Sequence, residues 1–134
     1  MKYDVRPRRN PIKKDQKLFY AAPVNSGNIE IDQITKEIAN ISALSRGDVM
    51  NVLEALLDVV PKYLSQGYSV KLGNFGTFRL SFSSKGVEKP EMVDPSLIKS
   101  KKIIFSSGVK LKKEVEDTKF EKAKSSGETV KPVV

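Results

Sequence analysis

The side chains of this sequence that could do chemistry are mostly cations. Twenty-four lysines and arginines stand against sixteen acids, which gives a formal net charge of +8. The excess is confined to two segments: residues 1–27 carry seven Lys or Arg against two acids, and residues 85–113 carry eight against three. Cations at this density bind polyanions, so the composition predicts a partner that is either nucleic acid or an acidic membrane surface.

The residues that most enzymes need are missing. The sequence has no cysteine and no histidine, which excludes thiolate nucleophiles, imidazole bases, disulfides and the usual ligands of zinc and haem. Its acids are scattered, with neither the spacing of a calcium loop nor a nucleotide-binding glycine loop. We therefore expect a protein that is not an enzyme and that uses no cofactor, metal or small-molecule substrate.

Membrane association is also not expected. No apolar run approaches the roughly 20 residues that span a bilayer. The start of the sequence lacks the apolar region of a signal peptide. These two features predict a cytoplasmic location and leave nucleic acid as the favoured partner.

The sequence predicts strands in its first segment and a helix after it. Residues 1–27 predict two short strands joined by a basic loop at residues 6–11, because two prolines exclude a helix there. From Asp32, isoleucines at helical spacing predict a first helix that ends at Ile41. Asp32 or Asn28 is available as its N-cap.

A longer second helix is predicted over residues 46–66. Ser45 is its expected N-cap, and Asp48 is placed to complete a capping box. Pro61 predicts a kink or a restart, and Gly67 predicts the end of the helix. The apolar stripe is too wide for one short neighbouring helix and predicts a partner subunit. It comprises Val49, Val52, Leu53, Leu56, Leu57, Val59, Val60 and Leu64.

Two glycines between two phenylalanines mark the next element. In Gly73-Asn74-Phe75-Gly76-Thr77-Phe78 the glycines permit a tight reversal while both rings enter one core. This pattern predicts a hairpin between strands at residues 68–72 and 77–83, and we assign it a structural role rather than ligand contact. On the second strand Phe78, Leu80 and Phe82 share one face, opposite Arg79.

A long basic excursion follows and returns as a strand. Residues 84–100 contain Gly86, Pro90 and Pro95 and predict a protruding or irregular arm, with the returning strand at residues 101–105. Ser106 or Ser107 is the expected N-cap of a last helix that reaches about Phe120. Residues 121–134 predict a polar, disordered tail.

The order of these elements resembles the HU and integration-host-factor family of bacterial histone-like DNA-binding proteins, and most of all its longer Bacteroidetes branch with an N-terminal extension. The likeness covers residues 29–120 and rests on the two helices, Val70-Lys71-Leu72, the glycine hairpin and Phe105-Ser106-Ser107-Gly108-Val109-Lys110-Leu111. It implies an α+β fold, an intertwined homodimer with a helical base, an antiparallel β saddle and two arms. The chain would comprise a basic extension (1–27), an HU-like DNA-binding and dimerisation domain (28–120) and a tail (121–134).

The resemblance also implies how the arm would act. In that family a proline near each arm tip enters the minor groove, wedges between base pairs and kinks the duplex. Pro90, which follows Lys89, falls near the position of this proline. It is either such a wedge or an ordinary turn residue.

The sequence departs from the family pattern at several positions. The usual saddle and arm arginines are replaced by serines at positions 81, 83 and 84, with Arg79 and Lys85 kept. The tip reads Glu88-Lys89-Pro90-Glu91, whose acids face phosphates badly. Arg9-Asn10-Pro11 in the extension could instead serve as a second or substitute contact.

These observations predict a non-catalytic, mostly sequence-nonspecific DNA-binding protein of the bacterial nucleoid that acts as a homodimer and can bend or compact DNA. The alternative is a dimeric HU-fold protein-interaction module with weak or no DNA binding. RNA binding lacks an aromatic stacking platform on the exposed strand face. The cations of the basic segments either contact phosphates or only keep an exposed arm and loop hydrated. The candidate DNA-contacting residues are Arg6, Arg8, Arg9, Arg79, Lys85, Lys89, Pro90, Lys99, Lys101, Lys102 and Lys110.

Overall fold

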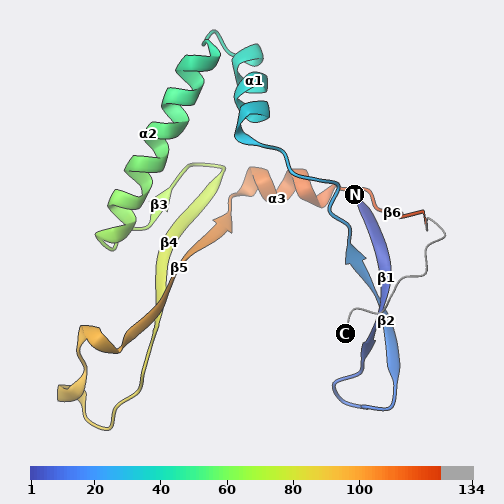
Figure 1. The fold of residues 1–134 in the computed structure, drawn as a ribbon, viewed down its shortest axis with the longest axis vertical. Coiled ribbons are helices and arrows are strands. Elements are labelled where there is room, and N and C mark those ends of the chain that lie inside the picture. The colour runs from blue at the N-terminus through green and yellow to red at the C-terminus, as the bar shows by residue number, and fades with distance from the viewer. Residues whose placement is uncertain (125–134) are drawn as a thin grey trace. The chain divides into compact units, whose positions relative to one another are not determined.

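The computed structural model of the chain describes residues 1–124, which form parts of two compact units. The hairpin unit combines Met1–Asn28 with the segment that begins at Asp117, and the helix–sheet unit is Ile29–Glu116 (Figure 1). The predicted division into segments 1–27, 28–120 and 121–134 differs from this grouping at its last boundary. Residues 117–124 group with the N-terminal segment rather than with the helices.

The hairpin unit is a three-stranded sheet in the order β2-β1-β6. Strands β1 (Lys2–Arg9) and β2 (Lys17–Pro23) are antiparallel, and β6 (Glu121–Lys122) runs parallel to β1. The prediction of a loop at residues 6–11 was wrong for residues 6–9, which belong to β1. Asn10 N–H donates to the Gln16 carbonyl, and in an antiparallel pair every second residue hydrogen-bonds to the same partner strand. The even-numbered residues of β1 therefore bond to β2, whereas the backbone of Pro7 points away from β2. A strand tolerates proline where no ladder donor is needed.

The short strand β6 lies where the sequence predicted the start of a disordered tail. Glu121 N–H donates to the Met1 carbonyl and Ala123 N–H to the Tyr3 carbonyl, at 3.1 and 2.9 Å. These ladder bonds fix residues 121–123 to β1, so that part of the prediction was wrong. Residues 125–134 of the predicted tail lie outside the described residues.

The helix–sheet unit begins with two helices, α1 (Ile31–Ile41) and α2 (Arg46–Ser65). The N-cap of α1 is Glu30 and makes no side-chain capping bond, so neither Asp32 nor Asn28 caps this helix as predicted. At α2 the predicted capping box is confirmed. The Ser45 hydroxyl accepts from Asp48 N–H at 3.1 Å, and the Asp48 carboxylate accepts from Ser45 N–H at 3.2 Å.

Helix α2 continues without a break through Pro61 to Ser65, so the helix does not restart there. A proline removes only one backbone donor, and the rest of the helical ladder can persist. Gly67, with φ of +90°, ends the helix as predicted. Gly67 N–H donates to the Leu64 carbonyl and Tyr68 N–H to the Tyr63 carbonyl, the bond pair of a Schellman cap.

The sheet of this unit has the order β3-β4-β5, with β3 (Val70–Lys71), β4 (Gly76–Ser84) and β5 (Ile98–Ser107) antiparallel to their neighbours. β4 and β5 extend away from the helices as a two-stranded arm (Figure 1). Two 3-10 turns, η1 (Pro90–Met92) and η2 (Pro95–Leu97), lie in the connection at its far end. The observed returning strand, β5, is therefore longer than the predicted strand at residues 101–105.

The glycine hairpin is confirmed between β3 and β4. Phe75 N–H donates to the Leu72 carbonyl and Leu72 N–H to the Gly76 carbonyl, at 3.0 and 2.9 Å. Gly76 has φ of +151°, and a Cβ there would collide with the carbonyl oxygen of Ser106 and the ring of Phe105. The turn therefore needs glycine both for its backbone conformation and for its approach to β5.

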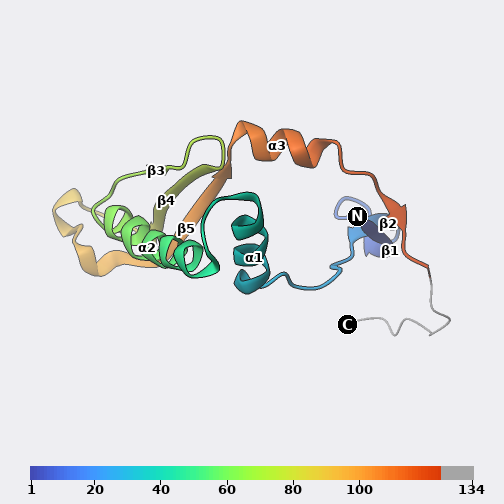
Figure 2. The same ribbon diagram turned by 90° about the horizontal axis from the view of Figure 1, so that it is seen from above.

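Helix α3 (Val109–Glu116) follows β5 directly (Figure 2). Ser106 and Ser107, the predicted caps, are the last residues of β5 instead. The helical ladder begins at the Gly108 carbonyl, which accepts from Lys112 N–H at 3.1 Å. Gly108 N–H is held by the Phe75 carbonyl at 2.9 Å, so the hairpin turn fixes the place where the strand becomes a helix. The helix ends four residues before the predicted Phe120.

The apolar core of the described chain is small. Val49 and Leu64 of α2 are each 3% exposed, and they are the only apolar side chains in residues 1–124 that count as buried. Phe75, Phe78 and Phe105 form a cluster with centroid separations of 4.8 to 6.5 Å, yet Phe75 and Phe105 remain exposed. On α2, three apolar residues of the predicted stripe, Val52, Leu56 and Val59, are exposed. Together with exposed Tyr63 they lie at helical spacing, and we call these four residues the α2 stripe.

Candidate nucleic-acid interface

The β4–β5 ribbon has one apolar and one polar face. Side chains of directly paired residues point to the same side of a sheet. Phe78 pairs with Phe105 and Leu80 with Ile103, which defines the apolar face. The opposite face carries Thr77, Arg79, Ser81 and Ser83 of β4, and Ile104 of β5 lies on it as the partner of Arg79. We call this second side the polar face.

A β-bulge decides which lysines join the polar face. Ser81 pairs with Lys102, but the next pair on this face is Ser83 with Lys99, so β5 contains one extra residue. Ser100 lies in this interval with φ of +54°, the left-handed conformation that the first residue of a G1 bulge adopts. Lys99 and Lys102 therefore lie on the same side as Arg79. Lys101, together with Ser100, lies opposite Phe82 on the apolar side.

The bulge also has a side-chain tie. The Ser83 hydroxyl donates to the Lys99 carbonyl at 3.2 Å across the two strands. Lys99, Lys102 and Arg79 are all exposed, and in residues 1–124 no carboxylate lies within ion-pair distance of any of them. Three unpaired cations on one side of a ribbon form a surface that phosphates can neutralise.

The far end of the arm has the opposite charge. Residues 86–97, which we call the acidic tip, contain one lysine, Lys89, and three acids, Glu88, Glu91 and Asp94. Hydrogen bonds from the Ser96 hydroxyl and then from its backbone N–H lower the pKa of Asp94, so this carboxyl is ionised at neutral pH. Pro90 opens η1, where its fixed φ suits the first position of a turn. Lys85 lies at the base of the tip, with its N–H bonded to the Leu97 carbonyl at 3.0 Å.

Comparison with known proteins agrees with this geometry. A family model described as an HU domain fused to wHTH, Ig, or Glycine-rich motif, abbreviated HU-HIG, matches residues 1–122. The chain belongs to the HU-HIG family. The predicted membership of the HU and integration-host-factor family is thereby confirmed.

Two further likenesses extend this result. Integration host factor subunit alpha from two strains of Haemophilus influenzae, KW20/Rd and 86-028NP, is 36% identical over 78 residues, or 57% of this chain and 81% of the relative. A crystal structure from Bacteroides vulgatus ATCC 8482, described as a candidate bacterial DNA binding protein, matches with a TM-score of 0.59 at 20% identity. It covers 90% of the HU-HIG chain, which spans about half (47%) of that solved chain. The predicted α+β, HU-like fold is confirmed by this match.

The remaining candidate residues of the HU-HIG chain lie on other elements than the β4–β5 ribbon. Lys110 is exposed in the first turn of α3. Arg6, Arg8 and Arg9 lie on β1 of the hairpin unit, and alternation places Arg6 and Arg8 on one side and Arg9 on the other. Arg6 Nε is 3.9 Å from an oxygen of Asp4, an exposed ion pair that contributes little stability.

The sequence-based set omitted three cations that the structure brings close to Arg8 and Arg9. Lys17 is the direct cross-strand partner of Arg9, and Lys13 and Lys14 lie in the loop that joins β1 to β2. The charge count of residues 1–27 already contained the signal. A strand register was needed to show that these side chains gather at one end of a hairpin.

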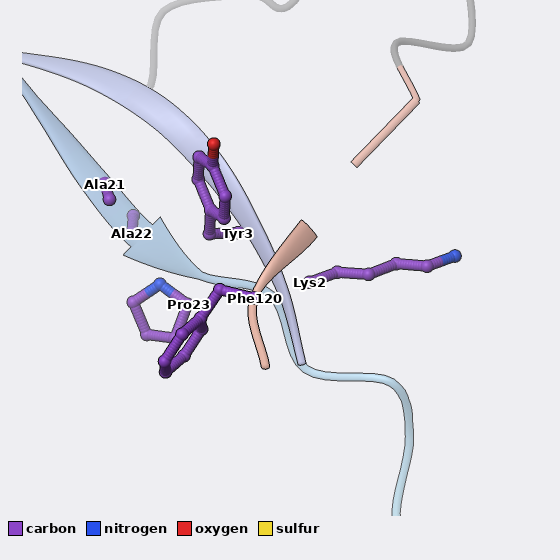
Figure 3. A pocket seen from close by; sticks show the side chains of 6 residues that line it. All are labelled: Lys2, Tyr3, Ala21, Ala22, Pro23 and Phe120. Carbon is purple, nitrogen blue, oxygen red and sulfur yellow. The ribbon is translucent and has the colours of Figure 1, made fainter. Parts of the chain in front are cut away.

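Other kinds of site find no support in the described part of the chain. In residues 1–124 no three acidic, histidine or cysteine side chains come together as a possible metal site. No helix of the same region is long and apolar enough to cross a membrane. The hairpin unit has an apolar pocket, around which Figure 3 shows the rings of Tyr3, Pro23 and Phe120, while the Lys2 side chain extends away from them. Ala21 and Ala22 complete its lining.

Proposed function

We propose that this protein is a non-catalytic, mostly sequence-independent DNA-binding protein of the bacterial nucleoid that bends or compacts DNA. The observation that carries the proposal is the polar face, where Arg79, Lys99 and Lys102 lie together on an exposed two-stranded ribbon. A ribbon of this kind fits a DNA groove, and unpaired cations on it neutralise backbone phosphates. Family membership and the likeness to integration host factor support the same conclusion.

Sequence-independent binding follows from the side chains of the polar face. Ser81 and Ser83 are too short to replace the arginines and amide side chains that form paired hydrogen bonds with base edges. The three cations contact phosphates, which carry no sequence information. Preference among sites would therefore come from the deformability of the DNA. In this proposal Lys85, Lys89 and Lys110 add phosphate contacts, and Pro90 is the wedge that kinks the duplex.

A homodimer is part of the proposal. The α2 stripe leaves Val52 60% exposed and Val59 48% exposed, although these residues lie on the same helix as the buried Val49 and Leu64. Apolar surface of this extent on a small unit is typical of a subunit interface. A second copy that covers the α2 stripe and the phenylalanine cluster would supply the core that one chain lacks. It would also present two polar faces to one DNA molecule.

The acidic tip favours a second candidate function. Met92 and Val93 are exposed among Glu88, Glu91 and Asp94, a combination that suits a basic protein partner better than a phosphate backbone. An HU-fold protein-interaction module with weak or no DNA binding would use the arms in this way.

Gel-shift titration of the full chain against random-sequence duplex DNA at about 50 and about 200 mM salt separates the two functions. DNA binding through several phosphate contacts predicts a shifted complex at low salt and an affinity at least about 100-fold weaker at high salt, because each contact releases counterions. Absence of a complex at low salt, or an affinity that does not change with salt, would reject the DNA-binding proposal and leave the interaction module.

A further inference from the structure

The N-terminal hairpin gathers most of its cations at one end. Residues 8–17, which we call the basic tip, hold five cations and one acid: Arg8, Arg9, Lys13, Lys14 and Lys17 against Asp15. The other end of the hairpin carries the apolar pocket, with Tyr3, Pro23 and Phe120 (Figure 3). Every residue of the basic tip except Asn10 is exposed. The exposed cations of the hairpin are therefore concentrated at the end that lies away from the pocket.

The basic tip is an ordered structure rather than a loose loop. Asn10 N–H donates to the Gln16 carbonyl at 2.9 Å, and Gln16 N–H to the Lys13 carbonyl at 3.0 Å. The Asn10 side-chain oxygen accepts from Ile12 N–H at 3.0 Å. These bonds fix the backbone that carries Lys13 and Lys14, so little backbone freedom remains to be lost when the tip binds a partner.

The two hairpin ends of the chain have opposite charge. The acidic tip of the β4–β5 arm has one lysine and three acids, whereas the basic tip has five cations and one acid. Within residues 1–124, Arg6 is the one cation that lies within ion-pair distance of a carboxylate, so the cations of the basic tip are unpaired there. Of these two tips, the basic tip of the N-terminal hairpin is thus the better suited to a phosphate backbone.

We propose that the basic tip is a second DNA-binding arm, which lies in a groove of duplex DNA and contacts the phosphates on either side. The proposal rests on the DNA-binding function above and assigns part of it to residues 8–17. A two-stranded β-ribbon has the width that the major groove admits. Lysines and arginines on both sides and on the connecting loop reach both phosphate backbones without reading bases.

The test compares two pairs of adjacent exposed lysines in the full chain. Lys13→Ala/Lys14→Ala removes two charges from the basic tip, and Lys112→Ala/Lys113→Ala removes the same charge from α3. Fluorescence anisotropy of a random-sequence duplex is measured over a salt series for both variants and the unchanged chain. Circular dichroism melting confirms that each variant is folded; if either does not fold, Lys→Gln at the same positions replaces it.

Each phosphate contact contributes about 0.9 to the slope of log affinity against log salt. The Lys13/Lys14 variant should therefore have a slope that is smaller in magnitude by about 1.8 if one tip of the dimer contacts DNA, and by about 3.6 if both tips do. The Lys112/Lys113 variant should keep the original slope. Equal changes in both variants would overturn the proposal, because overall charge would explain them. An unchanged slope in the Lys13/Lys14 variant would overturn it while the DNA-binding function stands. If the unchanged chain binds no DNA, both proposals fail.

Discussion

The bulge at Ser100 makes a prediction about three neighbouring lysines. Lys99 and Lys102 lie on the polar face with Arg79, whereas Lys101 lies opposite Phe82 on the apolar side. All three are exposed and each carries one positive charge. Replacing each one by alanine therefore removes the same charge from almost the same place. Only the direction of the lost side chain differs.

The expected size follows from counterion release. One lysine per chain is two phosphate contacts per proposed dimer, and each contributes about 0.9 to the salt slope, so Lys99→Ala and Lys102→Ala should each reduce it by about 1.8. When salt rises from about 50 to about 200 mM, the affinity of each variant should therefore fall by a factor about tenfold smaller than the factor by which the affinity of the unchanged protein falls. Lys101→Ala should leave the slope unchanged.

Fluorescence anisotropy with a labelled duplex of random sequence, over at least four salt concentrations, measures these slopes. Thermal melting of the three variants provides the control for folding. The reasoning from the bulge is refuted if Lys101→Ala changes the slope as much as Lys99→Ala. It is also refuted if neither Lys99→Ala nor Lys102→Ala changes it.

Four further predictions concern the scaffold and the arm. Ser45→Ala should lower the free energy of unfolding by about 1 kcal/mol in chemical denaturation, because it removes the N-cap of α2. The Ser45 hydroxyl and then its backbone N–H lower the pKa of Asp48. The contribution of Asp48 to stability should therefore be complete above about pH 3.9, the usual pKa of an aspartate. It should be lost as the pH falls through the lower pKa that Asp48 has in the folded protein. Thermal melting of Asp48→Asn and of the unchanged chain across this pH range measures the loss. Gly76→Ala should destabilise by at least about 2 kcal/mol, from overpacking against β5 and backbone strain, as measured by denaturation. Pro90→Ala should reduce the DNA bend angle measured by end-to-end fluorescence transfer.

The predictions for Asp48, Gly76 and Pro90 each have a contradicting result. A stability gap between Asp48→Asn and the unchanged chain that stays constant into acid would show that the capping box does not depend on the ionised carboxylate. Gly86 has a Cβ position with no atom within 4 Å, so Gly86→Ala is the control for Gly76→Ala, and equal effects would contradict the packing argument. An unchanged bend angle in Pro90→Ala would reject the wedge and leave Pro90 as the first residue of η1.

The sequence predicted the features that depend on local patterns. Helical spacing, the capping pair at Ser45 and Asp48, and the glycine hairpin around Phe75 are specified by residues within a few positions of each other, and the structure confirms them. The alternation of Phe78 and Leu80 likewise identified the apolar face of β4.

Features that depend on pairing between distant residues could not be predicted in this way. Simple alternation places Lys99 with Lys101, and only the slip against β4 moves Lys99 to the side of Lys102. Pro7 excluded a helix and so led to the prediction of a loop, but its backbone faces away from β2, where a strand requires no donor. The pairing of Glu121 with the beginning of β1 spans almost the whole described chain, and no local pattern indicates it.

Sedimentation velocity with a labelled random-sequence duplex at low salt measures dimerisation and DNA binding in one experiment, because it reports the protein mass that travels with the DNA. We expect the protein alone to sediment at twice the chain mass of 14.9 kDa. In the presence of DNA the label should move faster, as a complex that contains two chains. Protein that sediments as a single chain, with the label still moving as free DNA, would contradict both the dimer and the DNA-binding function.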